Sequence, residues 1–153
     1  MPSNPVPSNW PRLASVLYYD DAHAAIPWLC RAFGFCVRLK VAGPDGSVEH
    51  SELVFGDALV LVQSATQGRR VPLPSRSPRA LAGAVTQGLC VYVDDVDAHC
   101  DAARGAGARI LEAPATHCYG PDYPTHRRYR AEDLEGHNWW FMTRVREADV
   151  VAG

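Results

Sequence analysis

The strongest constraint on the fold is an order of predicted elements that occurs twice along the 153-residue chain. Residues 13–19 are an apolar run rich in β-forming residues, and the following Asp20 and Asp21 are typical of a helix N-cap. Apolar residues at helical spacing then continue to Gly34, a residue suited to ending a helix. Two strands around a glycine-rich turn and a third strand, ending near residue 63, complete this half. The first half therefore predicts the order βαβββ.

The second half repeats that order. Residues 89–93 form another short apolar run, an Asp–Asp pair follows it, and a helical segment ends at Gly105 and Gly107. Further predicted strands follow, two of them on either side of a turn at residues 133–136. An offset of 74 residues places Tyr18, Asp20, Asp21 and Ala24 on Tyr92, Asp94, Asp95 and Ala98. Because these identities fall in the same element order, the sequence predicts an internal duplication of one βαβββ module.

Proline and glycine mark the boundaries between these modules. Residues 65–86 are polar, basic and interrupted by prolines, and they are too long for a routine connection between elements. We therefore expect a linker between two units. The expected organisation is a loose N-terminal arm at 1–11, a first module at 12–64, the linker at 65–86, a second module at 87–146 and a tail at 147–153.

Composition and motifs argue against several classes of protein. Fifteen Lys and Arg residues against 17 Asp and Glu residues give a net charge of −2, so we expect no nucleic-acid partner. No apolar run approaches the roughly 20 residues of a membrane helix, so we expect no membrane span. Residues 1–11 match neither a signal peptide nor a transit peptide, which favours a cytoplasmic protein. The sequence contains no nucleophile elbow, P-loop or dinucleotide-binding glycine motif.

The five cysteines are an odd number, and no two of them form a CxxC pair. Without an export signal we expect reduced thiols, most of them buried as small apolar side chains. Cys118 is the most reactive candidate, because it follows His117 in a segment rich in glycine and proline.

Two segments carry a resemblance to a known family. They are the opening segment YYDDAHAAIPWLCRAFGF at 18–35 and the closing segment YRAEDLEGHNWWF at 129–141. With the paired βαβββ units they resemble the vicinal oxygen chelate superfamily, which includes glyoxalases, bleomycin-resistance proteins and ring-cleaving dioxygenases, over about residues 12 to 144. The resemblance implies an α+β fold in which two βαβββ modules form a cupped, partly closed mixed β-sheet with helices on the outer face. It also implies a homodimer that binds a small molecule in the hollow of the sheet.

Members of that family that bind a metal supply four ligands, whose positions can be followed in this chain. They fall on Ala14 or its neighbour Ser15, on Leu61, on Gly88 and on Trp140. Side chains of alanine, leucine, glycine and tryptophan offer no donor to a divalent cation, which needs imidazole or oxygen ligands. The resemblance therefore implies ligand binding without a metal, and we expect no other cofactor.

Alternation along the strands sorts the remaining side chains. On the last strand, Trp140 is expected to face the hollow, whereas Trp139 and Phe141 are expected to pack against the helices. The same rule turns side chains of the other strands inward, and the loop after the sixth strand adds one tyrosine. The candidate ligand-binding residues are Tyr18, His50, Glu52, Gln63, Tyr92, Tyr119, Arg128, Arg130 and Trp140. An aromatic and apolar centre with a few charges is typical of a small-molecule site.

Three functions remain open on the sequence. The first is metal-free binding of a small molecule, with Trp140 stacked on the ligand and Arg128 and Arg130 holding an anionic group by forked hydrogen bonds. The second is a metal-dependent lyase, isomerase or dioxygenase, and the third is an interaction module without a ligand. The non-standard metal ligands of the second would be His50, Glu52, His117 and His126, the last two expected in a long loop. No residue is assigned a catalytic role.

Overall fold

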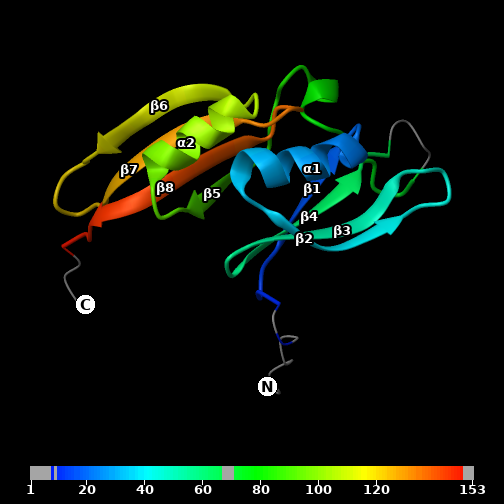
Figure 1. Ribbon diagram of the computed structural model, residues 1–153, viewed down its shortest axis with the longest axis horizontal. Coiled ribbons are helices and arrows are strands. Elements are labelled where there is room, and N and C mark those ends of the chain that lie inside the picture. The colour runs from blue at the N-terminus through cyan, green and yellow to red at the C-terminus, as the bar shows by residue number, and fades with distance from the viewer. Residues whose placement is uncertain (1–7, 9, 67–70, 150–153) are drawn as a thin grey trace.

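The computed structural model describes Ser8, residues 10–66 and residues 71–149. Most of the expected N-terminal arm, part of the linker and the last residues of the expected tail lie outside this described part. Figure 1 shows the two modules side by side, the first in blue to green and the second in green to red.

The first module has the predicted order of elements. The Asp21 side chain accepts a hydrogen bond from the Ala24 amide at 2.9 Å and so caps the helix. Gly34 ends the helix with a φ of 81°, a conformation that favours glycine. The elements are β1 (Ser15–Tyr19), α1 (Ala22–Phe33), β2 (Cys36–Ala42), β3 (Val48–Phe55) and β4 (Ala58–Ser64).

The second module has the same order. Asp95 caps its helix by accepting a hydrogen bond from the Ala98 amide at 3.0 Å, as Asp21 does in the first module. The elements are β5 (Gly88–Tyr92), α2 (Val96–Gly105), β6 (Arg109–His117), β7 (Thr125–Glu132) and β8 (Asn138–Arg146). In the linker, the short 3-10 helix η1 (Arg79–Leu81) precedes β5.

One expected loop is wrong. The segment after the sixth strand was expected to contain His117 and His126, yet His117 ends β6 and His126 lies in β7, where the two are partners across the strands. The misleading signal was Pro114, which suggests a loop. The β6 strand is the outer strand of its sheet, and its register shifts between Glu112 and Ala115, where Pro114 lies. Edge strands and bulges tolerate proline because no ladder hydrogen bond needs its missing N–H.

The described strands form two four-stranded sheets, ordered β1-β4-β3-β2 and β5-β8-β7-β6. In each sheet the first pair is parallel and the remaining pairs are antiparallel. The identical order confirms the predicted duplication and the α+β class with two βαβββ modules. The two sheets stay open and do not close on each other.

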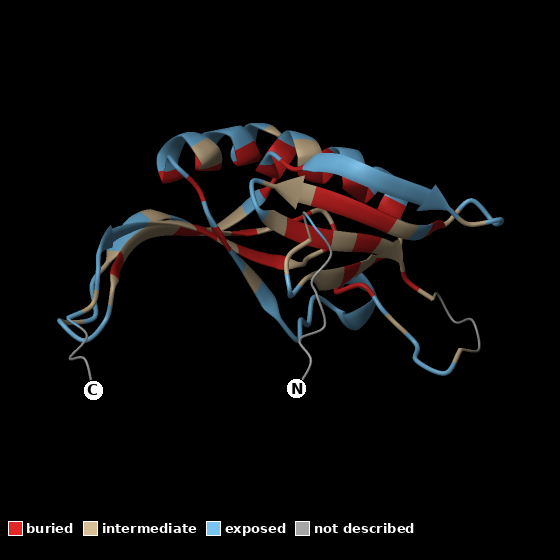
Figure 2. Cartoon of the chain, turned by 90° about the horizontal axis from the view of Figure 1, so that it is seen from below, coloured by how far each residue is buried: buried red, intermediate tan, exposed pale blue. Residues whose placement is uncertain are grey.

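Both helices lie on the same side of the two sheets, and the core lies between helices and sheets (Figures 1 and 2). Buried aromatic side chains from both modules meet there. The Phe33 ring of α1 lies 5.3 Å from the Trp139 ring and 4.7 Å from the Phe141 ring, both from β8. Neither α1 nor α2 lies on the opposite faces of the sheets, which we call the open faces; on the first of them, Leu81 of η1 lies near Val16 and Tyr18 of β1. Next to the C-terminus the second sheet bends away from the helices, so that its open face is concave (Figure 2).

The cysteines differ from expectation. All five are free, but Cys100 alone among them is buried, Cys30 is half-buried and the other three are exposed. The expectation that most are buried was wrong because Cys36 and Cys90 lie on exposed strand positions and Cys118 lies just beyond β6. No helix within the described residues has the length and apolar character needed to cross a membrane.

Candidate functional site

The nine predicted ligand-binding residues divide between the two sheets. Tyr18, His50, Glu52 and Gln63 lie on strands of the first sheet, and Tyr92, Arg128, Arg130 and Trp140 lie on strands of the second, with Tyr119 in the connection after β6. Strand pairing brings Tyr18 next to Gln63 on the first sheet and Arg130 next to Trp140 on the second. The hollow expected within one chain is therefore divided into two separate open faces.

On the first sheet, Glu52 is surrounded by partners. Its carboxylate accepts a hydrogen bond from Arg38 Nε at 2.7 Å and lies 3.2 Å from His50 Nε2. Burial alone would raise the pKa of Glu52, but the hydrogen bonds from His50 and Arg38 hold it below its usual value. The Arg38 guanidinium in turn lies over the Trp10 ring, 5.2 Å from its centroid. This carboxylate is already paired, which suits a structural role better than that of a general base.

Tyr18 and Gln63 lie elsewhere on the first sheet, where they are register partners on β1 and β4. Both line one cavity, of about 400 Å³, together with turn residues such as Pro44 and with Leu73 of the linker. Trp140 does not line this cavity. The predicted grouping of Tyr18 and Gln63 with Trp140 is not formed within one chain.

On the second sheet, strand register arranges the open face as three rows. Cys90, Trp140 and Arg130 are partners across β5, β8 and β7. Tyr92, Met142 and Arg128 form the next row, and Arg144, His126 and His117 form the third, across β8, β7 and β6. Neighbouring rows are two residues apart, so their side chains share one face. Aromatic and cationic side chains thus alternate around Met142.

Trp140 and Arg130 form a stacked pair in the first row. The Arg130 guanidinium carbon lies 4.6 Å from the centroid of the Trp140 ring. Arg130 Nε donates to Asn138 Oδ1 at 2.5 Å, and Glu112 Oε1 lies 3.6 Å from Arg130 Nη1. These contacts fix the guanidinium over the indole. The side chain of Trp140 is half-buried, so part of this pair faces solvent.

A glycine makes room for the Trp140 ring. A Cβ atom on Gly88 would lie 2.3 Å from Cζ3 of Trp140, which is closer than atoms can approach. The indole therefore occupies the space above β5 where any larger residue at position 88 would extend. Trp140 and Gly88 correspond to two of the metal-ligand positions of the family, so an aromatic ring stands where two ligands would be needed.

Arg128 has weaker partners than Arg130. Its Nη2 donates to the Tyr119 hydroxyl at 3.3 Å and lies 4.0 Å from Glu112 Oε2. Its Nε is buried and has no hydrogen-bond partner within the described residues. Tyr119 also lies 3.5 Å from His117 Nδ1, so its hydroxyl is near both Arg128 and His117. The neighbouring Arg127 points to the helix side, as alternation predicts.

A hydrogen-bonded cluster joins the second row to the third. Arg144 Nη2 donates to the Tyr92 hydroxyl at 2.7 Å, and that hydroxyl lies 3.0 Å from His126 Nε2. Burial lowers the pKa of His126, and the positive charges of Arg144 and Arg128 lower it further. A neutral His126 can accept the hydrogen bond from Tyr92 at Nε2.

Sequence reasoning missed several residues that support this face. Arg144 was missed because β8 was expected to end at Thr143, whereas it continues to Arg146. Extending the alternation of Trp140 and Met142 by one more step would have found it. Glu112 and Asn138 were not singled out as partners of the arginines, since only the folded register brings them there.

The donor set does not fit the metal site of the family. Ala14 or Ser15, Leu61, Gly88 and Trp140 occupy the corresponding positions, and Ser15 alone among them offers an oxygen. Ser15 alternates with the buried Leu17 and Tyr19, so it lies on the helix side of β1. The non-standard set also fails to converge, because His50 and Glu52 lie on the first sheet and His117 and His126 lie on the second. Within the described part of the chain, no group of three or more His, Cys, Asp or Glu side chains could hold a metal ion.

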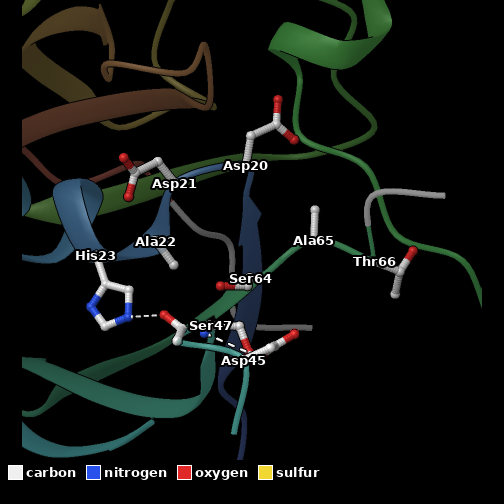
Figure 3. A pocket seen from close by; sticks show the side chains of 10 residues that line it. Asp20, Asp21, Ala22, His23, Asp45, Ser47, Ser64, Ala65 and Thr66 are labelled. Carbon is white, nitrogen blue, oxygen red and sulfur yellow. Dashed lines mark hydrogen bonds between the residues drawn. The ribbon is translucent and has the colours of Figure 1, made fainter. Parts of the chain in front are cut away.

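Another cavity, of about 330 Å³, lies at the start of α1 and contains none of the predicted site residues (Figure 3). Asp20, Asp21, His23 and Asp45 line it. The His23 ring is hydrogen-bonded to the Gly46 carbonyl, and Asp45 accepts from the Ser47 amide at 3.1 Å. These contacts hold the β2–β3 turn against the helix, so the polar groups have structural partners.

Comparison with known proteins agrees with this fold. The model of the Glyoxalase/Bleomycin resistance protein/Dioxygenase superfamily matches residues 12–141, and the chain belongs to that superfamily. It is 29% identical over 140 residues to the uncharacterized protein Mb0911c of Mycobacterium bovis, covering 92% of this chain and 88% of that protein. TioX from Micromonospora sp. ML1 is 29% identical, with a TM-score of 0.65, over 88% of this chain and 99% of TioX.

A more distant solved structure is similar to this chain in fold only. A glyoxalase I mutant from Zea mays is 18% identical with a TM-score of 0.63, over 90% of this chain and 44% of that one. The family description joins enzymes and resistance proteins, so membership by itself does not choose between catalysis and binding.

Proposed function

We propose that this protein binds a small molecule, without a metal, on the concave open face of its second sheet. The observation that carries the proposal is the row formed by Gly88, Trp140 and Arg130. An indole occupies the space of two family ligand positions, and a guanidinium is fixed over it at 4.6 Å. An aromatic surface with a few polar groups suits ligand binding by stacking.

This function fits the side chains better than metal-dependent catalysis does. The carboxylate of Glu52 is engaged by Arg38 and His50, and the two histidines of the second sheet lie apart from it. A lyase, isomerase or dioxygenase of this fold would need several oxygen or nitrogen ligands around one ion. The described residues do not offer such a set.

We further propose that a second copy of the chain completes the site. Each chain has two open faces with different chemistry, since the first carries Leu39 and Val41 beside Glu52, and the second carries arginines. Leu39 and Val41 are 43% and 40% exposed. Pairing the first open face of one copy with the second open face of its partner would cover this apolar surface.

A neutral aromatic probe tests the metal-free site. Protein treated with EDTA and dialysed should bind N-phenyl-1-naphthylamine, measured by probe fluorescence. Trp140→Ala should weaken binding about tenfold or more, because base-sized aromatic stacking contributes roughly 1–3 kcal/mol. Trp140→Phe keeps an aromatic ring and should retain most of the affinity.

Two outcomes would contradict the proposal. One is unchanged probe binding in Trp140→Ala, with far-UV circular dichroism showing a folded variant. The other is stoichiometric zinc, nickel, manganese or iron that survives dialysis, together with loss of ligand binding when EDTA removes it.

A further inference from the structure

We infer that the second open face selects a planar anion, an aromatic ring that carries a carboxylate, sulfonate or phosphate group. This inference rests on the proposed function and names the chemical class of its ligand. The ring would lie against the stacked Trp140–Arg130 pair, and Arg128 would receive the anionic group.

The charge of the face is the first observation. Arg128, Arg130 and Arg144 occupy three consecutive rows of the described second sheet, all on its open side. Three carboxylates accompany them, Glu112 on β6, Glu132 on β7 and Glu147 after β8, and each has an arginine partner, which for Glu132 is Arg109 at 3.1 Å. Because the whole chain has a net charge of −2, this positive surface is a local feature and not a property of the chain as a whole.

The uneven pairing of the arginines is the second observation. Arg130 is held by Asn138 at 2.5 Å and by the Trp140 ring, and Arg144 is held by Tyr92 at 2.7 Å and by Glu147 at 3.1 Å. Arg128 has a 3.3 Å contact with Tyr119, a 4.0 Å contact with Glu112 and a buried Nε without a partner within the described residues. A buried donor without an acceptor is unfavourable. The Arg128 side chain as a whole is 27% exposed, and its weak contacts leave guanidinium donors from which an oxyanion can accept.

The spacing of the two features sets the size of the ligand. Arg128 pairs with Met142, and Met142 lies two residues from Trp140 along β8. Diagonal neighbours of this kind are about 7–8 Å apart. One or two fused aromatic rings span that distance, so a ring on the Trp140–Arg130 pair can present its acidic group to Arg128. The planar guanidinium of Arg130 itself also favours stacking with an aromatic face.

Two probes that differ in charge test this inference. The anion 8-anilinonaphthalene-1-sulfonate has the same ring system as the neutral N-phenyl-1-naphthylamine but adds a sulfonate. The full-length protein should bind the anion about tenfold tighter, the range expected for one charge-assisted hydrogen-bonded contact. Added sodium chloride should weaken binding of the anion and leave the neutral probe unchanged.

Arg128→Gln should remove the preference for the anion, so that the two probes bind this variant with the same affinity. Arg128→Lys keeps the charge without the fork and should retain part of the preference. The matched control is Arg127→Gln, because Arg127 is adjacent on the same strand but points to the helix side, where Asp97 Oδ2 accepts from its Nε at 2.7 Å. That variant should bind both probes as the wild type does.

The outcomes separate this inference from the proposed function. Equal affinity for both probes, with both lost in Trp140→Ala, would overturn the anion inference and leave the binding site standing. Failure of both probes to bind the wild type would overturn both proposals. Displacement of the anion by micromolar single-stranded oligothymidylate would show a nucleic-acid surface and overturn the small-anion assignment.

Discussion

At the scale of single residues, adjacent tryptophans on β8 have opposite environments. Trp139 is fully buried under α1, and its Nε1 donates to Asp133 Oδ2 at 3.1 Å. The same carboxylate oxygen accepts from the Tyr19 hydroxyl at 2.7 Å, and Asp133 Oδ1 accepts from the Glu135 and His137 amides, both at 3.0 Å. The turn predicted at Asp133 thus also ties β8 to the first module. Trp140 points the other way, to the open face.

The two tryptophans should therefore differ in their effect on stability. Trp139→Ala should lower the free energy of unfolding by about 3–5 kcal/mol, the range for a large-to-small change in a core. It would also leave the buried Asp133 with one donor fewer. Trp140→Ala removes a half-buried ring and should cost clearly less. Chemical denaturation of both variants measures the difference, and equal losses would show that Trp140 is a core residue and not a ligand contact.

At the scale of elements, α2 is held against both modules by His99. Its Nε2 lies 3.0 Å from the Phe33 carbonyl, which only accepts, so Nε2 donates and Nδ1 accepts from the Tyr129 hydroxyl at 2.7 Å. The ring packs against Phe141, with centroids 4.3 Å apart. No role was expected for His99 from the sequence, because a histidine on a helix does not reveal which carbonyl it will meet.

This contact predicts a pH dependence of stability. Burial lowers the pKa of His99 below its ordinary value in the folded protein. Below about pH 6.5 the unfolded chain takes up a proton at this position before the folded chain does, so the free energy of unfolding should fall as the pH drops from about 7 towards 5. Denaturation at several pH values measures the slope.

The control for that slope is His99→Gln. Glutamine can keep one hydrogen bond but does not titrate. The variant should therefore be less stable at pH 7.5, and its free energy of unfolding should depend less on pH. His126 also has a lowered pKa, and it remains in both proteins, so its contribution cancels in the comparison. An unchanged slope in the variant would contradict the assignment to His99.

Most of the elements could be predicted from the sequence, and the errors lie on the outer strand of the second sheet and at strand ends. Aspartate caps and glycine stops act locally, so Asp21, Gly34 and Asp95 placed the helices correctly. The start of β6 at residues 109–112 was predicted, but its second half was taken for a loop because Pro114 breaks the local pattern, while its pairing with β7 is non-local.

At the scale of the whole molecule, neither α-helix covers an open face within the described residues, although part of the linker lies near β1 (Figure 2). Both helices occupy the other side, and α1 and α2 are joined there by Trp28, whose Nε1 donates to the Ala106 carbonyl at 3.1 Å. The proposed dimer follows from this arrangement, since an exposed apolar edge strand is unfavourable in water.

Sedimentation equilibrium tests the dimer. At micromolar concentration the wild type should have twice the mass of one chain. Leu39→Lys places a charge on the apolar part of the first open face and should shift the protein to single chains. Leu13→Lys is the control, because Leu13 is 87% exposed and precedes β1, outside both sheets. A wild-type mass of one chain at these concentrations would contradict the dimer.

The sequence by itself determined the duplicated modules and the direction of most side chains, because caps, turns and the two-residue period of strands act over a few residues. It also determined that Trp139 faces the core and Trp140 the open face. Only the tertiary structure decided which residues meet: it divided the predicted site between two open faces and paired Arg130 with Asn138 and Trp140. It also left Arg128 with the weakest contacts among the arginines described on the second open face. The reason is that strand register and module packing join residues far apart in sequence, and no local pattern encodes those distances.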